Sequence, residues 1–169
     1  MSEQNKNKGF SLIEIIVVIA LLAIVTGASA AAFSSVKSHK IKEFAGNINN
    51  AISETRTNTL TKSGSYELVI TYESNQFVAK LYHNGSLLET KTLTKDKKAS
   101  ISCVGATSSA NFKVEDGNDI RIAFNKADGS FSKMMIGSEE IKGSISVERA
   151  ARTKVINLVK LTGKHYMNS

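Results

Sequence analysis

Residues 8–14 read Lys8-Gly9-Phe10-Ser11-Leu12-Ile13-Glu14, and every side chain in the segment that follows, residues 15–25, is apolar. No charged residue occurs between residues 15 and 36, a run of 22 residues. A helix of that length rises about 33 Å, and the core of a lipid bilayer is about 30 Å thick. The pattern therefore predicts a transmembrane segment at about residues 11–34.

Glu14 is the only charged residue between Phe10 and residue 36. A carboxylate inside a bilayer costs about 2.5–3.5 kcal/mol, so such a group usually has a partner or a function. One interpretation places Glu14 in the solvated interface, with the membrane span beginning at residue 15. The other requires a cation from another molecule, because the apolar run itself contains none.

The stretch from Lys8 to Glu14 resembles the leader junction of type IV pilins and type II secretion pseudopilins. The resemblance implies that residues 1–9 form a leader, which a prepilin peptidase removes by cutting between Gly9 and Phe10. It also implies that Phe10 is N-methylated and that Glu14 neutralises the terminal amine of a neighbouring subunit. Such pairing gives the buried acid a partner in a medium of low dielectric.

Two observations oppose this interpretation. Residues 28–30, Ala-Ser-Ala, fit the cleavage site of an ordinary secretory signal, which would release a β-domain that begins at Ala31. Lysines at positions 37, 40 and 42 also outnumber those at positions 6 and 8, which argues against a cytoplasmic N-terminus. We give the leader motif precedence, because a secretory signal leaves Glu14 unexplained.

The remaining composition is that of a single modest domain. The chain has 169 residues and a formal net charge of +7, consistent with one globular domain behind an anchor. Its only cysteine, Cys103, excludes an intrachain disulfide. Cys103 lies in a segment with the pattern of a strand, where a thiol behaves as a small buried hydrophobe.

Apolar residues beyond residue 36 recur every three or four positions, as on one face of a helix: Ile41, Phe44, Ala45, Ile48, Ala51 and Ile52. We therefore expect one helix from Ser11 to about Thr59, about 70 Å long. Its first half would meet lipid or other helices, and its apolar stripe would pack beneath a globular domain. The expected division is a leader at 1–9, a helix at 10–60 and a β-rich head at 61–169.

The head alternates with period two and carries hairpin signals, notably Asn84-Gly85 and residues 125–129. About eight short antiparallel strands are expected, at residues 66–72, 77–82, 87–93, 101–104, 120–124, 131–136, 144–148 and 154–161. The predicted fold class is thus α+β, with a long helix packed on a mostly antiparallel sheet.

This plan resembles the H-type minor pseudopilins, in which a helix runs into an all-β head. Residues 50–60, with an arginine among small polar residues, resemble the helix end of that group. Residues 122–124, the turn with Gly129, and residues 155–163 are similar to its later strands.

No catalytic or cofactor motif occurs in the chain, so we predict neither an enzyme nor a cofactor. Glu115, Asp116 and Asp119 form an acidic cluster whose spacing does not match an EF-hand, and calcium binding there stays open. The C-terminal part is basic, which makes DNA capture an alternative function; the residues that would contact DNA are Arg149, Arg152, Lys154, Lys160 and Lys164.

The sequence thus predicts a minor pilin or pseudopilin that works by assembly. It would be a single-pass protein of the cell membrane, with its head outside the cytoplasm, that is assembled into a pilus or pseudopilus. The implied partners are prepilin peptidase, other pilin subunits, an inner-membrane assembly platform and membrane lipid. DNA is the less favoured partner, and a competence pilin or a secreted β-domain are the alternative functions.

Overall fold

The computed structural model describes the backbone of residues 10–168 and the side chains of residues 10–26 and 38–168. The chain forms two compact units, Met1–Lys37 and Ser38–Ser169. Each unit is described by itself, and we call the second one the head unit.

The helix α1 has the bounds Leu12–Thr61 and contributes to both units. It begins where the carbonyl oxygen of Ser11 accepts a hydrogen bond from the amide of Ile15, at 3.3 Å. The side chains of residues 27–37 lie outside the described residues, so a single continuous rod stays a prediction. Within the described part of the chain, no helix combines the length and the apolar character that a membrane crossing requires. The predicted transmembrane segment, at about residues 11–34, includes residues 27–34, and the side chains of these residues lie outside the described part of the chain.

The head unit is α+β, as predicted. Residues 10–168 contain ten strands and one short 3₁₀ helix besides α1. The elements are β1 (Tyr66–Glu73), β2 (Gln76–His83), β3 (Ser86–Thr94), β4 (Ala99–Gly105), β5 (Asn111–Lys113), η1 (Val114–Asp116), β6 (Ile120–Phe124), β7 (Phe131–Ile136), β8 (Glu139–Arg149), β9 (Arg152–Val159) and β10 (Lys164–Met167).

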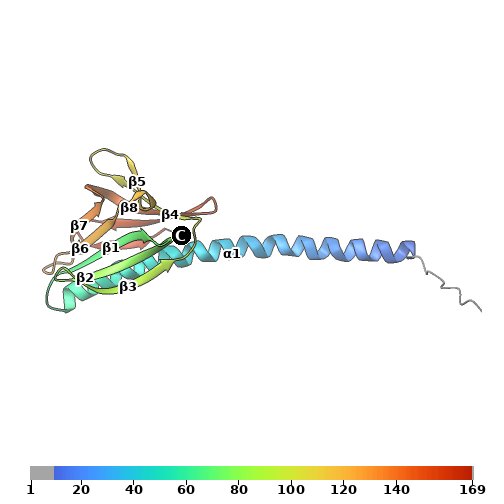
Figure 1. The fold of residues 1–169 in the computed structure, drawn as a ribbon, viewed down its shortest axis with the longest axis horizontal. Helices are drawn as coiled ribbons and strands as arrows, with labels where there is room; N and C mark the ends of the chain where they lie inside the picture. Colours follow the sequence, from blue (N-terminus) through green and yellow to red (C-terminus); the bar gives the residue numbers. More distant parts are fainter. Residues whose placement is uncertain (1–9, 169) are drawn as a thin grey trace, which may run out of the picture. The chain divides into compact units, whose positions relative to one another are not determined.

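All strand pairs are antiparallel, and their order is β10-β9-β8-β7-β6-β1-β2-β3, with β4 branching from β8 and β5 paired to β4. Figure 1 labels strands β1 to β8 of this arrangement. The long strand β8 makes this branching possible. Its first residues, Glu139 and Glu140, pair with β7, whereas Ile141 and residues 145–149 pair with β4. Residues 144–149 also pair with β9, so β8 joins two groups of strands.

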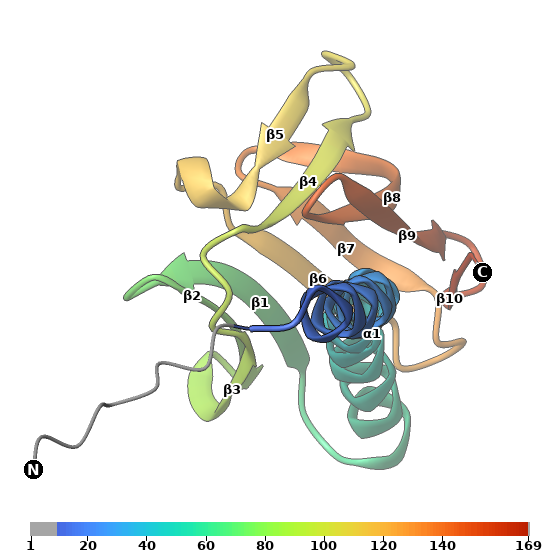
Figure 2. The same cartoon turned by 90° about the vertical axis from the view of Figure 1, so that its right-hand side faces the viewer.

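The sheet curves around the part of α1 that belongs to the head unit, with β1, β2 and β3 on one side and β8, β9 and β10 on the other (Figure 2). The predicted apolar stripe faces this concave surface. Its six residues are each at most 8% exposed. All but Ile41 join the main core cluster, to which strands β1 to β4 and β6 to β9 also contribute side chains. The prediction that the stripe packs on the sheet is confirmed.

Both ends of the strand order are fastened to the helix. The Asn47 side-chain amide donates a hydrogen bond to the carbonyl oxygen of Leu93 in the edge strand β3, at 3.1 Å. On the other flank, the hydroxyl of Ser53 lies 2.7 Å from Nε2 of His165 in the edge strand β10. Edge strands tend to pair with other chains, and these contacts hold each of them against α1.

Arg56 ties two loops to the same helix. Its guanidinium donates to the carbonyl oxygens of Gly129 and Thr162, each at 3.1 Å. The two loops approach so closely that a Cβ atom on Gly163 would lie 1.7 Å from the carbonyl oxygen of Gly129. The helix end, the β6–β7 turn and the β9–β10 turn therefore meet in space.

The predicted hairpins at Asn84-Gly85 and at residues 125–129 are confirmed, and so is the buried position of Cys103 in β4. The expected number of strands was too low. The three-residue strand β5 and the four-residue strand β10 were missed, and β9 ends at Val159, not at residue 161. Both missed strands are too short, at three and four residues, to show a period of two in the sequence.

Candidate assembly site

The part of α1 in the first unit exposes apolar side chains on all sides. The large apolar residues from Phe10 to Val25 are 48% to 80% exposed. A helix that is apolar all round is normally buried, either in a protein core or in lipid. An exposed apolar surface of this size marks a site of interaction with protein or membrane.

Glu14 lies in the first turn of this helix, and its amide donates to the carbonyl oxygen of Ser11 at 3.1 Å. Ser11 and Glu14 have the spacing of a capping box, and a carboxylate near a helix N-terminus is favoured by the helix dipole. Glu14 also lines a shallow hollow of about 250 Å³ together with Phe10, Ile15, Val18 and Ile19. Phe10 and Glu14 thus border one recess, in which the carboxylate is the only ionisable side chain.

The remaining predictions for this site stay predictions. Gly9 lies outside the described residues, so the structure shows nothing of the proposed cleavage junction. Phe10 precedes the helix and is 79% exposed. Its place beside Glu14 is compatible with a terminal amine near that carboxylate, but the pairing predicted from the sequence involves another subunit.

Arg149 and Arg152 pair with each other beside the β8–β9 turn, Lys160 and Lys164 flank the β9–β10 turn, and each of the five basic residues proposed to contact DNA has a contact within the chain. Arg149 forms an ion pair with Asp96, and Lys160 forms one with Glu140. Lys154 donates to the carbonyl oxygen of Asn168 at 3.2 Å, and the Lys164 ammonium lies 5.9 Å from the centroid of the Tyr166 ring. Arg152 also has a partner. DNA contact by this set stays a prediction.

The acidic cluster is divided among structural contacts. Glu115 Oε2 accepts the amide of Ile101 at 3.4 Å, and Asp119 lies 3.7 Å from the guanidinium of Arg121. In the part of the chain that the structure describes, no group of three or more His, Cys, Asp or Glu side chains could hold a metal ion.

One pair of side chains in the head resembles part of a catalytic triad. Ser53 and His165 form a serine–histidine pair, and Nδ1 of His165 lies 3.1 Å from the carbonyl oxygen of Gly163. A carbonyl oxygen occupies the place that a carboxylate takes in a catalytic triad. The pair joins α1 to β10 and is accounted for by that structural contact.

The comparisons with known proteins bear on the amino-terminal region. Residues 4–30 match the family model of the prokaryotic N-terminal methylation motif. No curated protein and no solved structure is significantly similar to the chain. The matched segment contains Gly9, Phe10 and Glu14, and it supports the pilin and pseudopilin family, with processing by prepilin peptidase and assembly with other pilins.

Proposed function

We propose that this chain is a minor subunit of a type IV pilus or a type II secretion pseudopilus, anchored in the membrane by its amino-terminal helix until it is assembled. The observation that carries the proposal is the methylation motif at residues 4–30, followed by a helix whose apolar side chains are exposed on all sides. In this proposal residues 1–9 are the leader, residues 10–60 form one long helix that spans the membrane at about 11–34, and the β-rich head lies outside the cytoplasm. An inner-membrane assembly platform would deliver the subunit to the fibre.

A structural role agrees with the chemistry of the described residues. Several polar groups of the head form ion pairs and hydrogen bonds that hold strands and loops together, as Arg56 and Arg149 do. The exposed apolar helix, by contrast, has the character of an interface. The H-type minor subunit is the form we favour, because Arg56 joins the helix end to the Gly129 and Thr162 loops whose sequences resemble that group.

The mature N-terminus tests the proposal. We expect the intact mass of membrane-extracted protein to correspond to a chain that begins at N-methylated Phe10. Gly9→Val should retain residues 1–9, because the glycine leaves the backbone accessible to the peptidase. Gly27→Val is the matched control and should be processed normally. A wild-type terminus at Ala31 would overturn the proposal in favour of a secreted β-domain.

Glu14 tests the assembly step separately from insertion. Glu14→Ala removes the cost of placing a carboxylate in the bilayer, so the variant should remain in the membrane at least as well as wild type. Its incorporation into sheared surface fibres should fall at least tenfold, because the neighbouring terminal amine loses its partner. Fractionation of processed protein between membrane and fibre measures both effects. Undiminished incorporation would show that Glu14 serves only as an interfacial or capping residue.

A further inference from the structure

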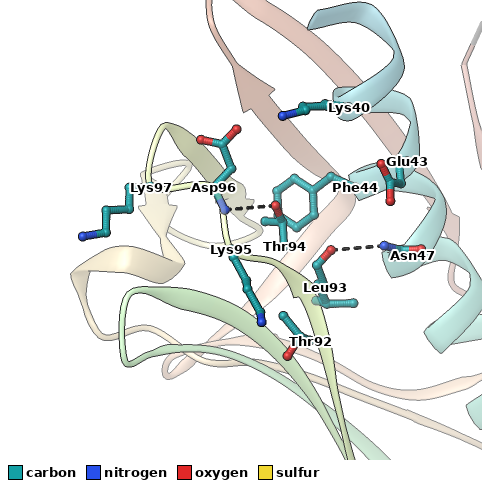
Figure 3. A pocket seen from close by; sticks show the side chains of 10 residues that line it. All are labelled: Lys40, Glu43, Phe44, Asn47, Thr92, Leu93, Thr94, Lys95, Asp96 and Lys97. Carbon is teal, nitrogen blue, oxygen red and sulfur yellow. Dashed lines mark hydrogen bonds between the residues drawn. The ribbon is translucent and has the colours of Figure 1, made fainter. Parts of the chain in front are cut away.

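Five exposed lysines surround the end of the head unit at which the chain enters it. Lys40 and Lys42 belong to the first turns of α1 in this unit, and Lys95, Lys97 and Lys98 form the loop between β3 and β4. Lys40, Lys95 and Lys97 line a hollow of about 570 Å³, in which Glu43 and Asp96 are the only acids (Figure 3). We call these five residues the proximal lysines.

The two acids of the hollow, Glu43 and Asp96, neutralise only part of the positive charge of this surface. Within residues 38–168, none of the proximal lysines forms an ion pair with a carboxylate. Asp96, the acid nearest to three of them in sequence, is paired with Arg149. Some lysines elsewhere on the head have acidic partners: Lys80 contacts Glu73 at 2.6 Å, and Lys133 contacts Glu67 at 3.0 Å. Other lysines among residues 38–168 form no ion pair either, so the proximal lysines are distinguished by their grouping at one end of the head unit.

A second flank of the helix carries the same charge. Lys42 lines a hollow of about 220 Å³ with Lys154, Met167 and Asn168. Residues 40 and 42 are about 200° apart around a helix axis, so positive charge lies on both sides of the incoming chain. Met167 is 39% exposed there and adds an apolar group beside the lysines.

We propose that the proximal lysines form a docking surface for the headgroups of anionic phospholipids. The inference rests on the proposed membrane anchor, and the connectivity of the chain supplies the location. Lys40 is six residues beyond residue 34, where the proposed span ends. Along the proposed continuous helix six residues rise about 9 Å, and the headgroup layer is roughly 5–8 Å deep on each side of the bilayer. A lysine side chain extends its ammonium beyond its own backbone position, so Lys40 is held within reach of the lipid phosphates.

Lipid fits this surface better than nucleic acid does. Sequence-tolerant binding of single strands uses exposed aromatic rings on which bases stack. The only ring that lines the larger hollow belongs to Phe44, which is 2% exposed. Lysine ammonium groups act as point charges toward phosphates, and a cluster of basic residues beside a membrane helix attracts anionic lipid wherever the facing leaflet contains it.

Amine footprinting tests the proposal. It uses the wild-type chain, so the result does not depend on whether a variant folds. The full chain is placed in nanodiscs of phosphatidylcholine alone or with phosphatidylglycerol, and the acetylation rate of each lysine is measured by mass spectrometry. Attraction by an anionic surface corresponds to about a fivefold effect per lysine. We therefore expect Lys95, Lys97 and Lys98 to react about fivefold more slowly in the anionic discs. Lys113, Lys126 and Lys142, which are exposed elsewhere on the head, are the internal controls and should not change.

Salt and competing anions complete the experiment. At 0.5 M salt the Debye length falls to about 4 Å, and the protection should largely disappear. Inorganic phosphate or a short DNA duplex is added separately to the neutral discs. Protection by phosphate would reveal a site for free anions, and protection by DNA a nucleic-acid surface; either result without protection in anionic discs would overturn the proposal. Equal rates in both discs without added anions would overturn it as well.

The intact mass of the same sample separates this inference from the function on which it rests. A chain that begins at methylated Phe10, remains in the disc and shows no protection would overturn the lipid surface alone. A chain that begins at Ala31 and leaves the disc would overturn the membrane anchor, and the lipid surface with it.

Discussion

Gly163 lies where two loops of the head touch. Its φ of +64° belongs to the left-handed region, and an added Cβ would lie 1.7 Å from the carbonyl oxygen of Gly129. Backbone atoms cannot move aside as a side chain can. We expect Gly163→Ala to lower the free energy of unfolding by about 3 kcal/mol, of which about 1 kcal/mol is conformational. Gly117→Ala is the matched control, since φ is +86° there and nothing lies within 4 Å. Urea unfolding measures both, and equal losses would contradict a contact between the loops.

His165 gives the head a dependence on pH. Burial lowers the pKa of its imidazole, the nearby Arg56 charge lowers it further, and the hydrogen bond to the Gly163 carbonyl only partly opposes these effects. The unfolded chain therefore binds a proton more readily than the folded one. The contribution of His165 to stability is complete above the unfolded pKa of about 6.5 and is lost as the pH falls through the folded pKa.

We expect the free energy of unfolding to decrease between pH 7 and pH 5, and His165→Gln to flatten that decrease. Glutamine can still hydrogen-bond to Ser53 but does not titrate. His39→Gln is the control, since His39 is exposed on the helix. Denaturant melts at several pH values provide the measurement, and an unchanged slope in His165→Gln would assign the pH dependence to other groups.

The turn between β8 and β9 is built from residues that do not favour it. Ala150 and Ala151 have φ values of +49° and +60°, which is the geometry of a type I′ turn, in which Asn-Gly is strongly preferred. The β2–β3 turn uses that pair, with Asn84 and Gly85 at +50° and +81°.

Replacing the two alanines, as Ala150→Asn with Ala151→Gly, should therefore raise the free energy of unfolding by about 1–2 kcal/mol. Gly85→Ala imposes the reverse change on a turn of the same shape, and it should lower the free energy by about 1 kcal/mol. Thermal unfolding of both variants tests the argument. A loss of stability in the first would mean that contacts of the alanine methyl groups outweigh the backbone strain.

This turn also illustrates what local sequence can and cannot predict. Asn84-Gly85 and the apolar period of α1 are local signals strong enough to predict a hairpin and a buried helix face. The pair Ala150-Ala151 carries no turn signal, because alanine does not favour a positive φ. Its conformation is imposed by the pairing of β8 with β9. Strands β5 and β10 escaped prediction because they are too short to show a period of two.

The candidate site divides in a similar way. The segment from Gly9 to Glu14 is contiguous and could be recognised from the sequence alone. The proximal lysines could not, since Lys40 and Lys97 are brought together only when the β3–β4 loop folds beside the helix. The charge excess of the C-terminal part was visible in sequence, but its ion pairs were not: Arg149 finds Asp96, which is 53 residues away.

The single cysteine reports on the integrity of the whole head. Burial raises the pKa of the Cys103 thiol to about 12, and its side chain is 2% exposed. Because the thiolate is the reactive form, we expect labelling by a thiol reagent to be at least a hundredfold slower in the folded protein than in urea. Ile48→Asp places a carboxylate in the core formed by α1 and the sheet, and it should make Cys103 reactive without denaturant. Glu54→Asp is the control, because it changes another residue of α1 and keeps a carboxylate at that position. Slow labelling in Ile48→Asp would show that the head keeps its core without the stripe.

The attachment of both edge strands to α1 has a mechanical consequence. Asn47 holds β3 and Ser53 holds β10, and the two residues lie about 9 Å apart along the helix and on different flanks. A tensile load applied at residue 38 along the helix axis is therefore shared between both margins of the sheet, which must slide past the helix together. Loading in shear resists extension more strongly than peeling contacts apart one at a time. A pull on the chain at residue 38 would therefore move the helix and both sheet margins of the head as one body.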